Sequence, residues 1–330
     1  MRRRYVMPAF AGASVFAFVC VLSCLPSAEA AEGGFRIGIV EQQLSNPFFA
    51  KLEQSAVEAA KTHGIETMTA EAGSAGDAAT QLAAIENMIN RGVKGIVLDP
   101  ANAFALVGVV KKARDAGIVV VTTNTSLDPP TAADASYETD NLAAGELIGK
   151  WAKARLGSAA PKVVLLDYDL SDKTAKARHD GFLKGFGLTE SSAEIVGTAL
   201  TQGNVETGQS SMENLLSAHP DVNVVYTINE PAAQGAFLAL KKAKQAVALT
   251  SIDGSCSGVR SVADGTIGAT VMQFPANMGQ LAVEAVAKAV NGGPKPGGIN
   301  NSGTVLITDH PVDGIESKDS KWGLAHCWGE

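Results

Sequence analysis

Short apolar runs alternate with helical patterns along most of the chain. Segments such as 37–40, 95–98 and 118–121 are apolar and short, as buried strands are. Between them, apolar residues recur every three or four positions, as on one face of a helix. Strand and helix in regular alternation predict an α/β fold, in which helices cover both faces of a parallel sheet.

The first such unit carries two aromatic residues at the start of its helix. A strand at 37–40 leads into a polar loop that ends at Asn46, which we expect to cap the helix that begins at Pro47. Phe48 and Phe49 follow in the first turn. Adjacent helical positions lie about 100° apart, so both rings cannot easily face the core. We therefore expect at least one ring to line a cleft.

The predicted elements fall into two similar series of about five strands each. The other predicted strands are 65–70, 163–166, 195–199, 224–227, 248–252, 267–272 and 304–307, with helices between them and an irregular tail after the last. Two such series predict two doubly wound, Rossmann-like parallel-sheet domains with the ligand in the cleft between them.

The order of the elements also predicts how often the chain crosses between domains. A proline-containing loop at 124–135 precedes the first crossing. A predicted helix at 278–290 comes after the second series is complete, so it can return to the first domain. We predict an N-terminal domain of residues 31–138 plus 275–302 and a C-terminal domain of 139–274 plus 303–330. Several crossings would form a multi-strand hinge.

The N-terminus has the three parts of a secretory signal peptide. Three arginines at 2–4 precede an apolar stretch at 15–25, and Ala28-Glu-Ala30 matches the small-x-small cleavage pattern. The apolar stretch is shorter than the ~20 residues of a spanning helix. We predict that residues 1–30 are a signal peptide, cleaved near Ala30, and that the chain is exported to the periplasm. A buried helix is the alternative, and Sec or twin-arginine export stays open.

Charge and cysteine content narrow the range of functions. The full chain has 27 basic and 34 acidic residues, of which three basic residues and one acidic residue lie in the predicted signal peptide. The mature chain therefore has 24 basic and 33 acidic residues, a net charge of −9. This acidic balance argues against nucleic acid as a partner. The mature chain keeps Cys256 and Cys327. Two cysteines can pair in an oxidising compartment, but the sequence leaves this candidate disulfide open.

Motifs for catalysis and cofactors are largely missing from the sequence. It contains no Walker loop, dinucleotide fingerprint or zinc-ligand pattern. Gly254-Ser-Cys256-Ser-Gly258 superficially resembles a nucleophile elbow, but no partner base is evident. We predict a non-enzyme without cofactor or metal, and a periplasmic enzyme using Cys256 is the remote alternative.

Polar side chains follow the predicted strands at their carboxyl ends, where open α/β sheets bind ligands. They are Asn124, Thr125, Asp167, Asp169, Asp172, Asn229, Asp253 and Gln273, and Arg178 lies on the helix that follows the strand 163–166. Singly, each fits a helix cap or a loop; Asn229 and Asp253 in particular would make ordinary N-caps. Together with two phenyl rings, carboxylates, amides and a guanidinium suit the hydroxyls and C–H faces of a sugar. A buried hydrogen-bonding group left unpaired costs about 1–3 kcal/mol, so such a site would reject a misplaced hydroxyl.

Several short motifs resemble one known family. They are Ser45-Asn-Pro-Phe-Phe49, Val119-Val-Val-Thr-Thr-Asn124, Ala177-Arg-His-Asp-Gly-Phe182, Ala218-His-Pro-Asp-Val222, Thr227-Ile-Asn229-Glu, Ser251-Ile-Asp253-Gly and Ala269-Thr-Val-Met-Gln273. Over essentially all of its mature length the chain resembles periplasmic sugar-binding proteins of the ribose/galactose type, which feed ABC importers. The resemblance implies a monosaccharide ligand, permease subunits as partners, a monomer, three interdomain crossings, and ligand contacts at Asn46, Phe48, Phe49, Arg178, Asn229, Asp253 and Gln273.

Two departures from that family bear on the sugar. Ribose binders have an aspartate and an arginine where this chain has Asn124 and Thr125, and an aromatic residue where it has Gly203. More room and different hydroxyl contacts favour a hexose, and Asp172 can supply another acceptor. The tail 312–328 resembles tails of fructose-type binders. Fructose is therefore the favoured prediction, with ribose, mannose or a polyol as alternatives.

Other functions fit the sequence less well. LacI-type repressors share the two-domain core, but they begin with a DNA-binding helix-turn-helix where this chain has an export signal. Presentation of the sugar to a chemoreceptor or sensor is compatible with transport, and the sequence neither favours nor excludes it.

Overall fold

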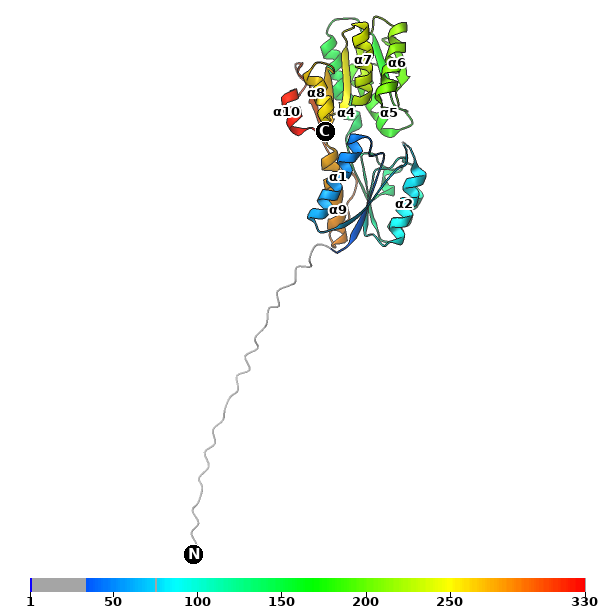
Figure 1. Ribbon diagram of the computed structural model, residues 1–330, viewed down its shortest axis with the longest axis vertical. Helices are drawn as coiled ribbons and strands as arrows, with labels where there is room; N and C mark the ends of the chain where they lie inside the picture. The colour runs from blue at the N-terminus through cyan, green and yellow to red at the C-terminus, as the bar shows by residue number, and fades with distance from the viewer. Residues whose placement is uncertain (2–33, 75, 330) are drawn as a thin grey trace. The chain divides into compact units, whose positions relative to one another are not determined.

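Two six-stranded sheets, each covered by helices, form most of the described part of the chain (Figure 1). The computed structural model describes residue 1, residues 34–74 and residues 76–329. The predicted signal peptide and its cleavage site therefore lie outside the described residues, apart from Met1. Within the described part of the chain, every helix is too short or too polar to cross a membrane.

The first sheet is parallel throughout, with the strand order β11-β5-β4-β3-β1-β2. Its strands are β1 (Arg36–Glu41), β2 (Glu66–Glu71), β3 (Gly95–Leu98), β4 (Val119–Thr123), β5 (Ala135–Glu138) and β11 (Ile299–Asn301). Its helices are α1 (Pro47–Thr62), α2 (Ala78–Asn90), α3 (Val107–Asp115) and α9 (Pro275–Val290). We name this sheet and its helices the first lobe.

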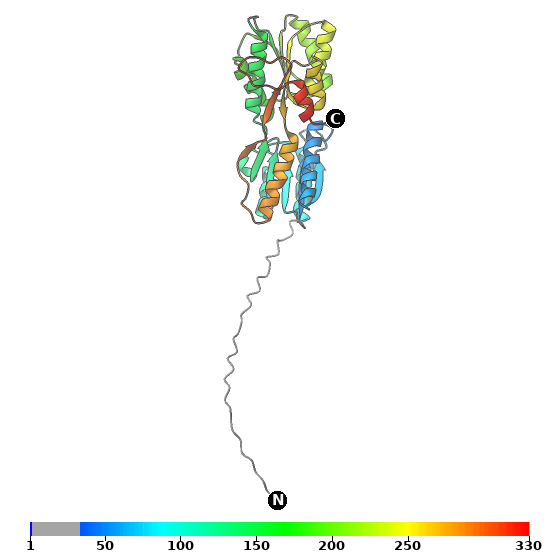
Figure 2. The ribbon, with the colours of Figure 1, turned by 90° about the vertical axis from the view of Figure 1, so that its left-hand side faces the viewer.

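Helices cover both faces of the first sheet, as the continuous apolar strands predict. Alternate residues of β1 point to opposite faces: Ile37 and Ile39 pack with residues of α1 and α9, whereas Val40 packs in the cluster of α2 and α3. Helices α1 and α9 lie side by side on their face (Figure 2). Segments more than 200 residues apart in sequence thus share one core.

The second sheet has the order β12-β10-β9-β8-β6-β7 and is parallel except for β12. Its strands are β6 (Val163–Asp167), β7 (Ile195–Leu200), β8 (Val224–Thr227), β9 (Ala248–Asp253), β10 (Ala269–Gln273) and β12 (Thr304–Ile307). Its helices are α4 (Asn141–Leu156), α5 (Lys173–Phe186), α6 (Val205–Ala218), α7 (Glu230–Ala243), α8 (Cys256–Ala263) and α10 (Ser320–His326). We name this sheet and its helices the second lobe.

Helices α4 and α5 approach each other closely because glycines face the contact. A Cβ atom built on Gly145 of α4 would lie 2.2 Å from the carbonyl oxygen of Arg178. One built on Gly181 of α5 would lie 2.2 Å from the carbonyl oxygen of Leu142. Any larger side chain would push the two backbones apart. This close approach holds Arg178 beside the N-terminus of α4.

The chain passes between the lobes at three places: after β5, after β10, and between β11 and β12. These crossings lie near residues 139, 274 and 303. The exact limits of two separately moving domains remain a prediction.

Sequence patterns missed three elements and misplaced the start of another. Strands β5 and β11 are short, and they lie at the end of the first sheet beside crossings, where local pattern carries little information. The tail predicted to be irregular contains α10, and Asp319 caps its start. Helix α9 begins at Pro275 rather than Met278, because proline is well tolerated in a first helical turn.

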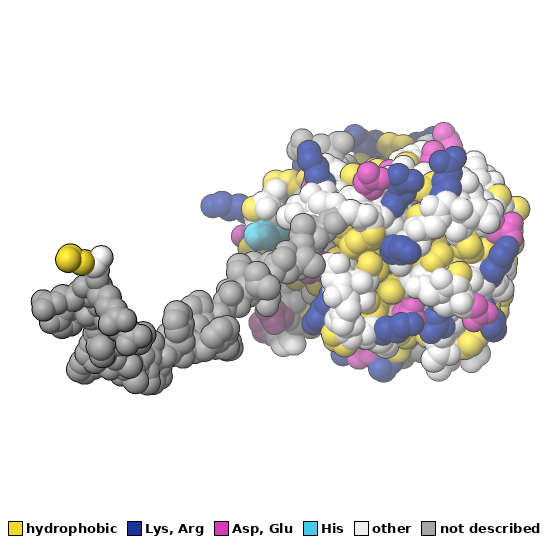
Figure 3. Space-filling view, turned by 90° about the horizontal axis from the view of Figure 1, so that it is seen from below, with side chains coloured by type: hydrophobic (Ala, Val, Ile, Leu, Met, Phe, Trp, Pro, Cys, Tyr) yellow, Lys and Arg dark blue, Asp and Glu magenta, His cyan; other side chains and the backbone are white. Residues whose placement is uncertain are grey.

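The face seen in Figure 3 carries basic and acidic side chains interspersed with apolar ones. Ion pairs such as Arg36–Glu66 and Lys112–Glu86 are exposed, and such pairs are worth about 0–1 kcal/mol each. The fold is therefore held mainly by its buried apolar clusters rather than by these charges.

Candidate ligand-binding site

A pocket of about 200 Å³ lies between the lobes and is lined by residues of both. All ten residues proposed from sequence line it: Asn46, Phe48, Phe49, Asn124, Thr125, Asp172, Arg178, Asn229, Asp253 and Gln273. Pockets for drug-sized molecules usually have volumes of about 300–1,000 Å³. The smaller volume here suits a small molecule such as a single sugar ring.

The strand order of each sheet explains why the pocket lies where it does. In the first sheet β1 lies between β2 and β3, and in the second β6 lies between β7 and β8. The helices that follow neighbouring strands therefore leave on opposite faces, which opens a crevice at the carboxyl ends of the strands. The two crevices face each other across the pocket.

Asn46, Phe48 and Phe49 form one side of the pocket at the start of α1. The Asn46 side-chain oxygen accepts from the backbone N–H of Phe48 at 3.0 Å, so the predicted N-cap is confirmed. The two rings contact each other edge to face, with centroids 5.6 Å apart. Phe48 is only 5% exposed and also packs against Leu52. One ring is thus partly a core residue, yet both line the pocket.

Asn124 is held from behind by a buried carboxylate. Its Nδ2 lies 3.3 Å from both oxygens of Asp99, and Nε2 of Gln42 donates to the same carboxylate at 3.1 Å. Asn124 has φ of 59°, a left-handed conformation that asparagine adopts more readily than most residues. Asp99 thus orients two amide side chains of the pocket.

The acids behind this wall are held in an apolar setting. Burial raises the pKa of Asp99 to about 8. Burial also raises the pKa of Glu41 well above its ordinary value, with a further contribution from Asp99. The two carboxylate oxygens of Glu41 have no hydrogen-bond partner within the described residues. Burial therefore favours the uncharged form of both acids.

Arg178 is the buried cation of the second lobe, 6% exposed. Its Nε donates to Oδ1 of Asn141 at 2.8 Å, and Nη1 donates to the carbonyl oxygen of Ile228 at 3.1 Å. Nη1 also lies 3.9 Å from Oδ1 of Asp253. A guanidinium has five N–H groups, and these contacts use two. The fixed fork can present the others to ligand hydroxyls.

Asp253 and Gln273 form a linked pair beside Arg178. Gln273 Nε2 donates to Oδ1 of Asp253 at 3.1 Å, and Oε1 of Gln273 accepts from the Thr139 hydroxyl at 2.9 Å. The other Asp253 oxygen accepts from the backbone N–H of Glu230. Burial, then the nearby Glu230, raises the pKa of Asp253 to about 7, although Arg178 opposes the shift. Asp253 therefore does not cap its own helix, which Ser255 does instead.

Asn229 and Asp172 combine capping with a place in the pocket. Asn229 Oδ1 accepts from the N–H of Ala232, and Nδ2 donates to the carbonyl oxygen of Gly203 at 2.9 Å. Gly203 has a φ of 65°, and a Cβ atom there would lie 2.8 Å from that Nδ2 atom, so any larger residue would be strained and would displace the amide. Asp172 caps α5 through Ala175. Asn229 and Asp172 are thus helix caps, as their positions in the sequence allowed, and both also line the pocket.

Sequence reasoning missed several residues of the pocket wall. These are Gln42, Gln43, Tyr168, Thr174, Ala175, Gln202 and Ile228, while Gly203, which the sequence had singled out as a departure from the family, also lines the pocket. Gln42 and Gln43 follow β1 directly, so the same rule of strand ends could have found them. Tyr168 follows β6 and brings an aromatic ring to the second lobe. The Thr125 and Thr174 hydroxyls lie 3.2 Å apart and join the two lobes.

Two acids that the sequence placed at strand ends do not line the pocket. Both oxygens of Asp167 lie 3.1 Å from Nδ1 of the buried His179, whose Nε2 is 3.2 Å from Glu190. Asp169 accepts from the N–H of Ser171 in a local turn. Among the described residues, His179, Asp180 and Glu190 offer metal-type ligand atoms close together, but this histidine is already engaged.

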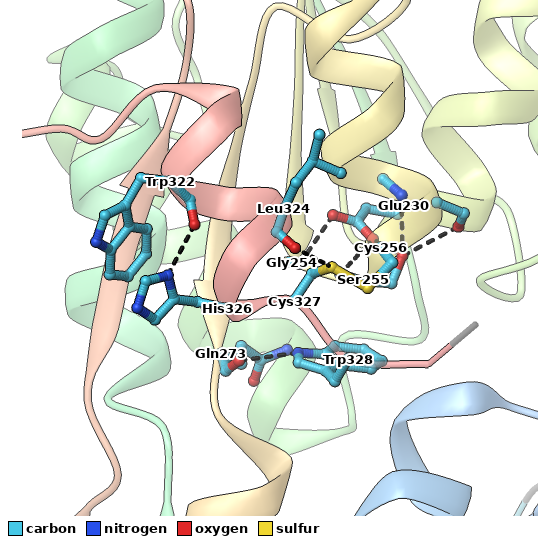
Figure 4. The surroundings of a disulfide bond; sticks show 12 residues. Glu230, Gly254, Ser255, Cys256, Gln273, Trp322, Leu324, His326, Cys327 and Trp328 are labelled. Carbon is cyan, nitrogen blue, oxygen red and sulfur yellow. Dashed lines mark hydrogen bonds between the residues drawn. A yellow bond between two sulfur atoms is a disulfide. The ribbon is translucent and has the colours of Figure 1, made fainter.

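Cys256 and Cys327 form a disulfide across 71 residues of sequence (Figure 4). The question that the sequence left open is thus resolved in favour of pairing. A disulfide sulfur has no thiolate to act as a nucleophile, so this pairing argues against a catalytic Cys256. Cross-links of this kind typically add about 2–4 kcal/mol of stability.

These features define a class of protein: a two-lobed α/β binding protein with its ligand site between the lobes. The site has hydrogen-bonding groups and rings but lacks a nucleophile–base pair among its described lining residues.

The chain belongs to the periplasmic binding protein domain family, which its residues 37–294 match. It is 28% identical to the ribose import binding protein RbsB of Bacillus subtilis, over 81% of this chain and 85% of that protein. It is 29% identical to a D-ribose/D-allose-binding protein of Pseudomonas aeruginosa, over 78% and 82%. An ABC transporter solute binding protein of Agrobacterium vitis, solved with bound D-fucose, has a TM-score of 0.75 at 29% identity, over 84% and 97%.

Proposed function

We propose that this protein is the periplasmic sugar-binding component of an ABC importer. It binds one monosaccharide between its lobes, closes around it, and delivers it to the permease subunits in the membrane. Export requires that residues 1–30 act as a signal peptide cleaved near Ala30. The lobes move as domains of residues 31–138 plus 275–302 and 139–274 plus 303–330.

The observation that carries this proposal is the composition of the pocket. Rings from Phe48 and Phe49 lie on one side, and the fork of Arg178 with the carboxylate of Asp253 lies on the other. A phenyl face covers C–H groups of a sugar, while an arginine–carboxylate pair donates to and accepts from its hydroxyls. With Asp172 also present, acids in the wall outnumber Arg178, which disfavours an anionic ligand.

The identity of the sugar is a finer question. The names of the relatives above support an aldose such as D-ribose or D-allose. The prediction of fructose depends on the resemblance of the tail 312–328 and on the departures at Asn124, Thr125 and Gly203. Tyr168 weakens that choice, because it supplies a ring to the second lobe despite Gly203.

A thermal-shift screen tests the proposal directly. The mature protein would be heated with D-ribose, D-allose, D-fucose, D-fructose, D-mannose and myo-inositol. A ligand that binds only the native state raises Tm. At a ligand concentration of 100 times Kd, it increases the free energy of unfolding by about 2.7 kcal/mol. Failure of every sugar to raise Tm would contradict the proposal. Small-angle scattering of the protein saturated with the sugar that binds best should then show a smaller radius of gyration than that of the ligand-free protein.

A further inference from the structure

The C-terminal tail is joined to the second lobe next to its last tryptophan. Cys327 follows α10 and is bonded to Cys256 at the start of α8. The backbone N–H of Cys256 donates to the carbonyl oxygen of Trp328 at 2.9 Å, and Ser255 forms a bridge with Trp328. The covalent anchor and the tryptophan are therefore adjacent residues, fixed to one helix start (Figure 4).

The indole of Trp328 contacts one pocket residue from each lobe. Its Nε1 donates to the backbone carbonyl of Gln273 at 2.9 Å, next to the second interlobe crossing. Its ring packs edge to face against Phe48, with centroids 5.4 Å apart. Trp328 is only 6% exposed, yet it is not itself a lining residue of the pocket. It lies behind Phe48, outside the pocket, and lines a surface groove together with Cys327.

Trp328 supplies part of the packing around Phe48. Its ring lies in a small cluster with Leu52, Met278 and Trp328, partly covered by Phe49. Trp328 is the member of this cluster that the second lobe supplies. Without it, Phe48 would gain rotational freedom that ligand binding must then remove, and a less preorganised site binds more weakly.

We propose that Trp328 is a positioning residue for the sugar site, and that the Cys256–Cys327 disulfide controls affinity by holding Trp328 against Phe48 and Gln273. This inference rests on the proposed function and deepens it. It makes sugar affinity depend on the oxidation state of a bond outside the pocket.

The redox step balances with a dithiol as reductant. The dithiol gives two electrons and two protons to the disulfide, which becomes two thiols at Cys256 and Cys327, while the dithiol closes into its own cyclic disulfide. Cys327 is partly exposed and lines a surface groove together with Lys51 and Gln54 of α1, so a small reagent can reach it.

Calorimetric titration of the mature protein tests the inference, with the best binder among D-ribose, D-allose and D-fructose as probe. Trp328→Ala and the double variant Cys256→Ser/Cys327→Ser should each weaken binding about tenfold, because Phe48 loses its preorganised position. Reduction of the wild-type protein with a dithiol should do the same. Trp328→Phe keeps an aromatic ring against Phe48 and should restore most of the affinity.

Trp322→Ala is the matched control. Trp322 belongs to the same tail, and its ring stacks on His326 rather than on a pocket residue. It should leave Kd unchanged even if it lowers Tm. A Trp328→Ala protein that binds within twofold of wild type would overturn the inference, as would an equal loss in Trp322→Ala.

A measurement without ligand separates this inference from the proposed function. Hydrogen–deuterium exchange of residues 46–52 should be faster in Trp328→Ala and in the reduced protein than in the oxidised wild type. Unchanged exchange there would refute the positioning role even if every sugar failed to bind. Faster exchange with no sugar binding would support the positioning role and count against the sugar-binding proposal alone.

Discussion

The two walls of the pocket differ in how they carry polarity. The second-lobe wall contains a buried cation, Arg178, and two carboxylates, Asp172 and Asp253. The first-lobe wall presents amides, a hydroxyl and two rings, and its acids, Asp99 and Glu41, lie behind it in an apolar setting. This difference suggests that the second lobe supplies most of the hydrogen-bonding strength, whereas the first lobe selects the shape of the ring.

Removing the Arg178 guanidinium should lower sugar affinity more than any other change in either wall. Arg178→Ala removes the cation beside Asp253 and the donor to Oδ1 of Asn141. Losing one member of a buried charged pair costs about 2–5 kcal/mol in binding. Sugar affinity should fall at least about thirtyfold, since 1.4 kcal/mol corresponds to a factor of ten. Calorimetric titration measures Kd.

Lys176→Ala is the matched control for Arg178, because Lys176 lies on the same helix, is exposed and pairs with Asp180. It should bind sugar as wild type does. If the Kd of Arg178→Ala stayed within twofold of the wild-type value, Arg178 would not be part of the sugar site.

The two rings of the first-lobe wall should respond differently. Phe48→Ala opens a cavity in a buried cluster and should lower stability by about 3–5 kcal/mol as well as affinity. Phe49 is less buried, so Phe49→Ala should lower Tm less than Phe48→Ala does. It should weaken sugar binding about five- to tenfold, because an aromatic contact contributes about 1 kcal/mol. Denaturant unfolding and titration of each variant separate the two effects. Equal losses of stability would contradict the assignment of Phe48 to the core.

The acid behind the first-lobe wall should make stability depend on pH. An unfolded aspartate titrates near pH 4, whereas the pKa of Asp99 in the fold is about 8. The folded protein therefore binds the extra proton between these values, and its unfolding free energy should fall as pH rises from about 4 to 8. Asp99→Asn cannot titrate, so its stability should fall less across this window.

Denaturant unfolding of ligand-free wild type and Asp99→Asn at several pH values checks this expectation. Glu41 and Asp253 also have raised pKa values and contribute the same sign in both proteins. Because Asp99 adds to the shift of the Glu41 pKa, the difference between the two curves reports Asp99 together with its effect on Glu41. Parallel curves would show that Asp99 is ionised at neutral pH.

The smallest effect should come from an exposed ion pair between the two lobes, outside the pocket wall. Lys173 of α5 lies 3.2 Å from Asp128 of the first lobe, and both side chains are more than a third exposed. Such pairs are worth about 0–1 kcal/mol, so Lys173→Ala should weaken binding about two- to threefold at low salt. The difference should vanish in 1 M salt, where charges are screened within about 3 Å. An undiminished loss at high salt would mean that Lys173 acts by packing.

Local sequence rules predicted the residues of the pocket better than the contacts among them. Apart from Phe48, Phe49 and Arg178, which lie within α1 and α5, each predicted residue follows a strand or caps a helix, and in a parallel sheet these positions converge by geometry alone. The rules did not find Asp99, although it follows β3 directly, because its role depends on Asn124 and Gln42 lying above it. They also missed Tyr168, because a single aromatic residue in a loop has no periodic pattern.

The tail illustrates the same limit. The sequence predicted an irregular tail and missed α10. This helix is only seven residues long, and short helices depend on tertiary contacts. Nothing in the order of residues 327–328 indicates that an indole will contact Phe48, more than 270 positions earlier in the chain.

The sequence by itself determined the alternation of strands and helices, the crevices at the strand ends, and the family of the protein, because these depend on local periodicity and on short motifs. Tertiary structure alone decided that Cys256 pairs with Cys327, that Gly145 and Gly181 let α4 and α5 hold Arg178 in place, and that Trp328 lies behind the pocket. These features depend on distances between residues far apart in the chain, which close only when the two sheets have packed.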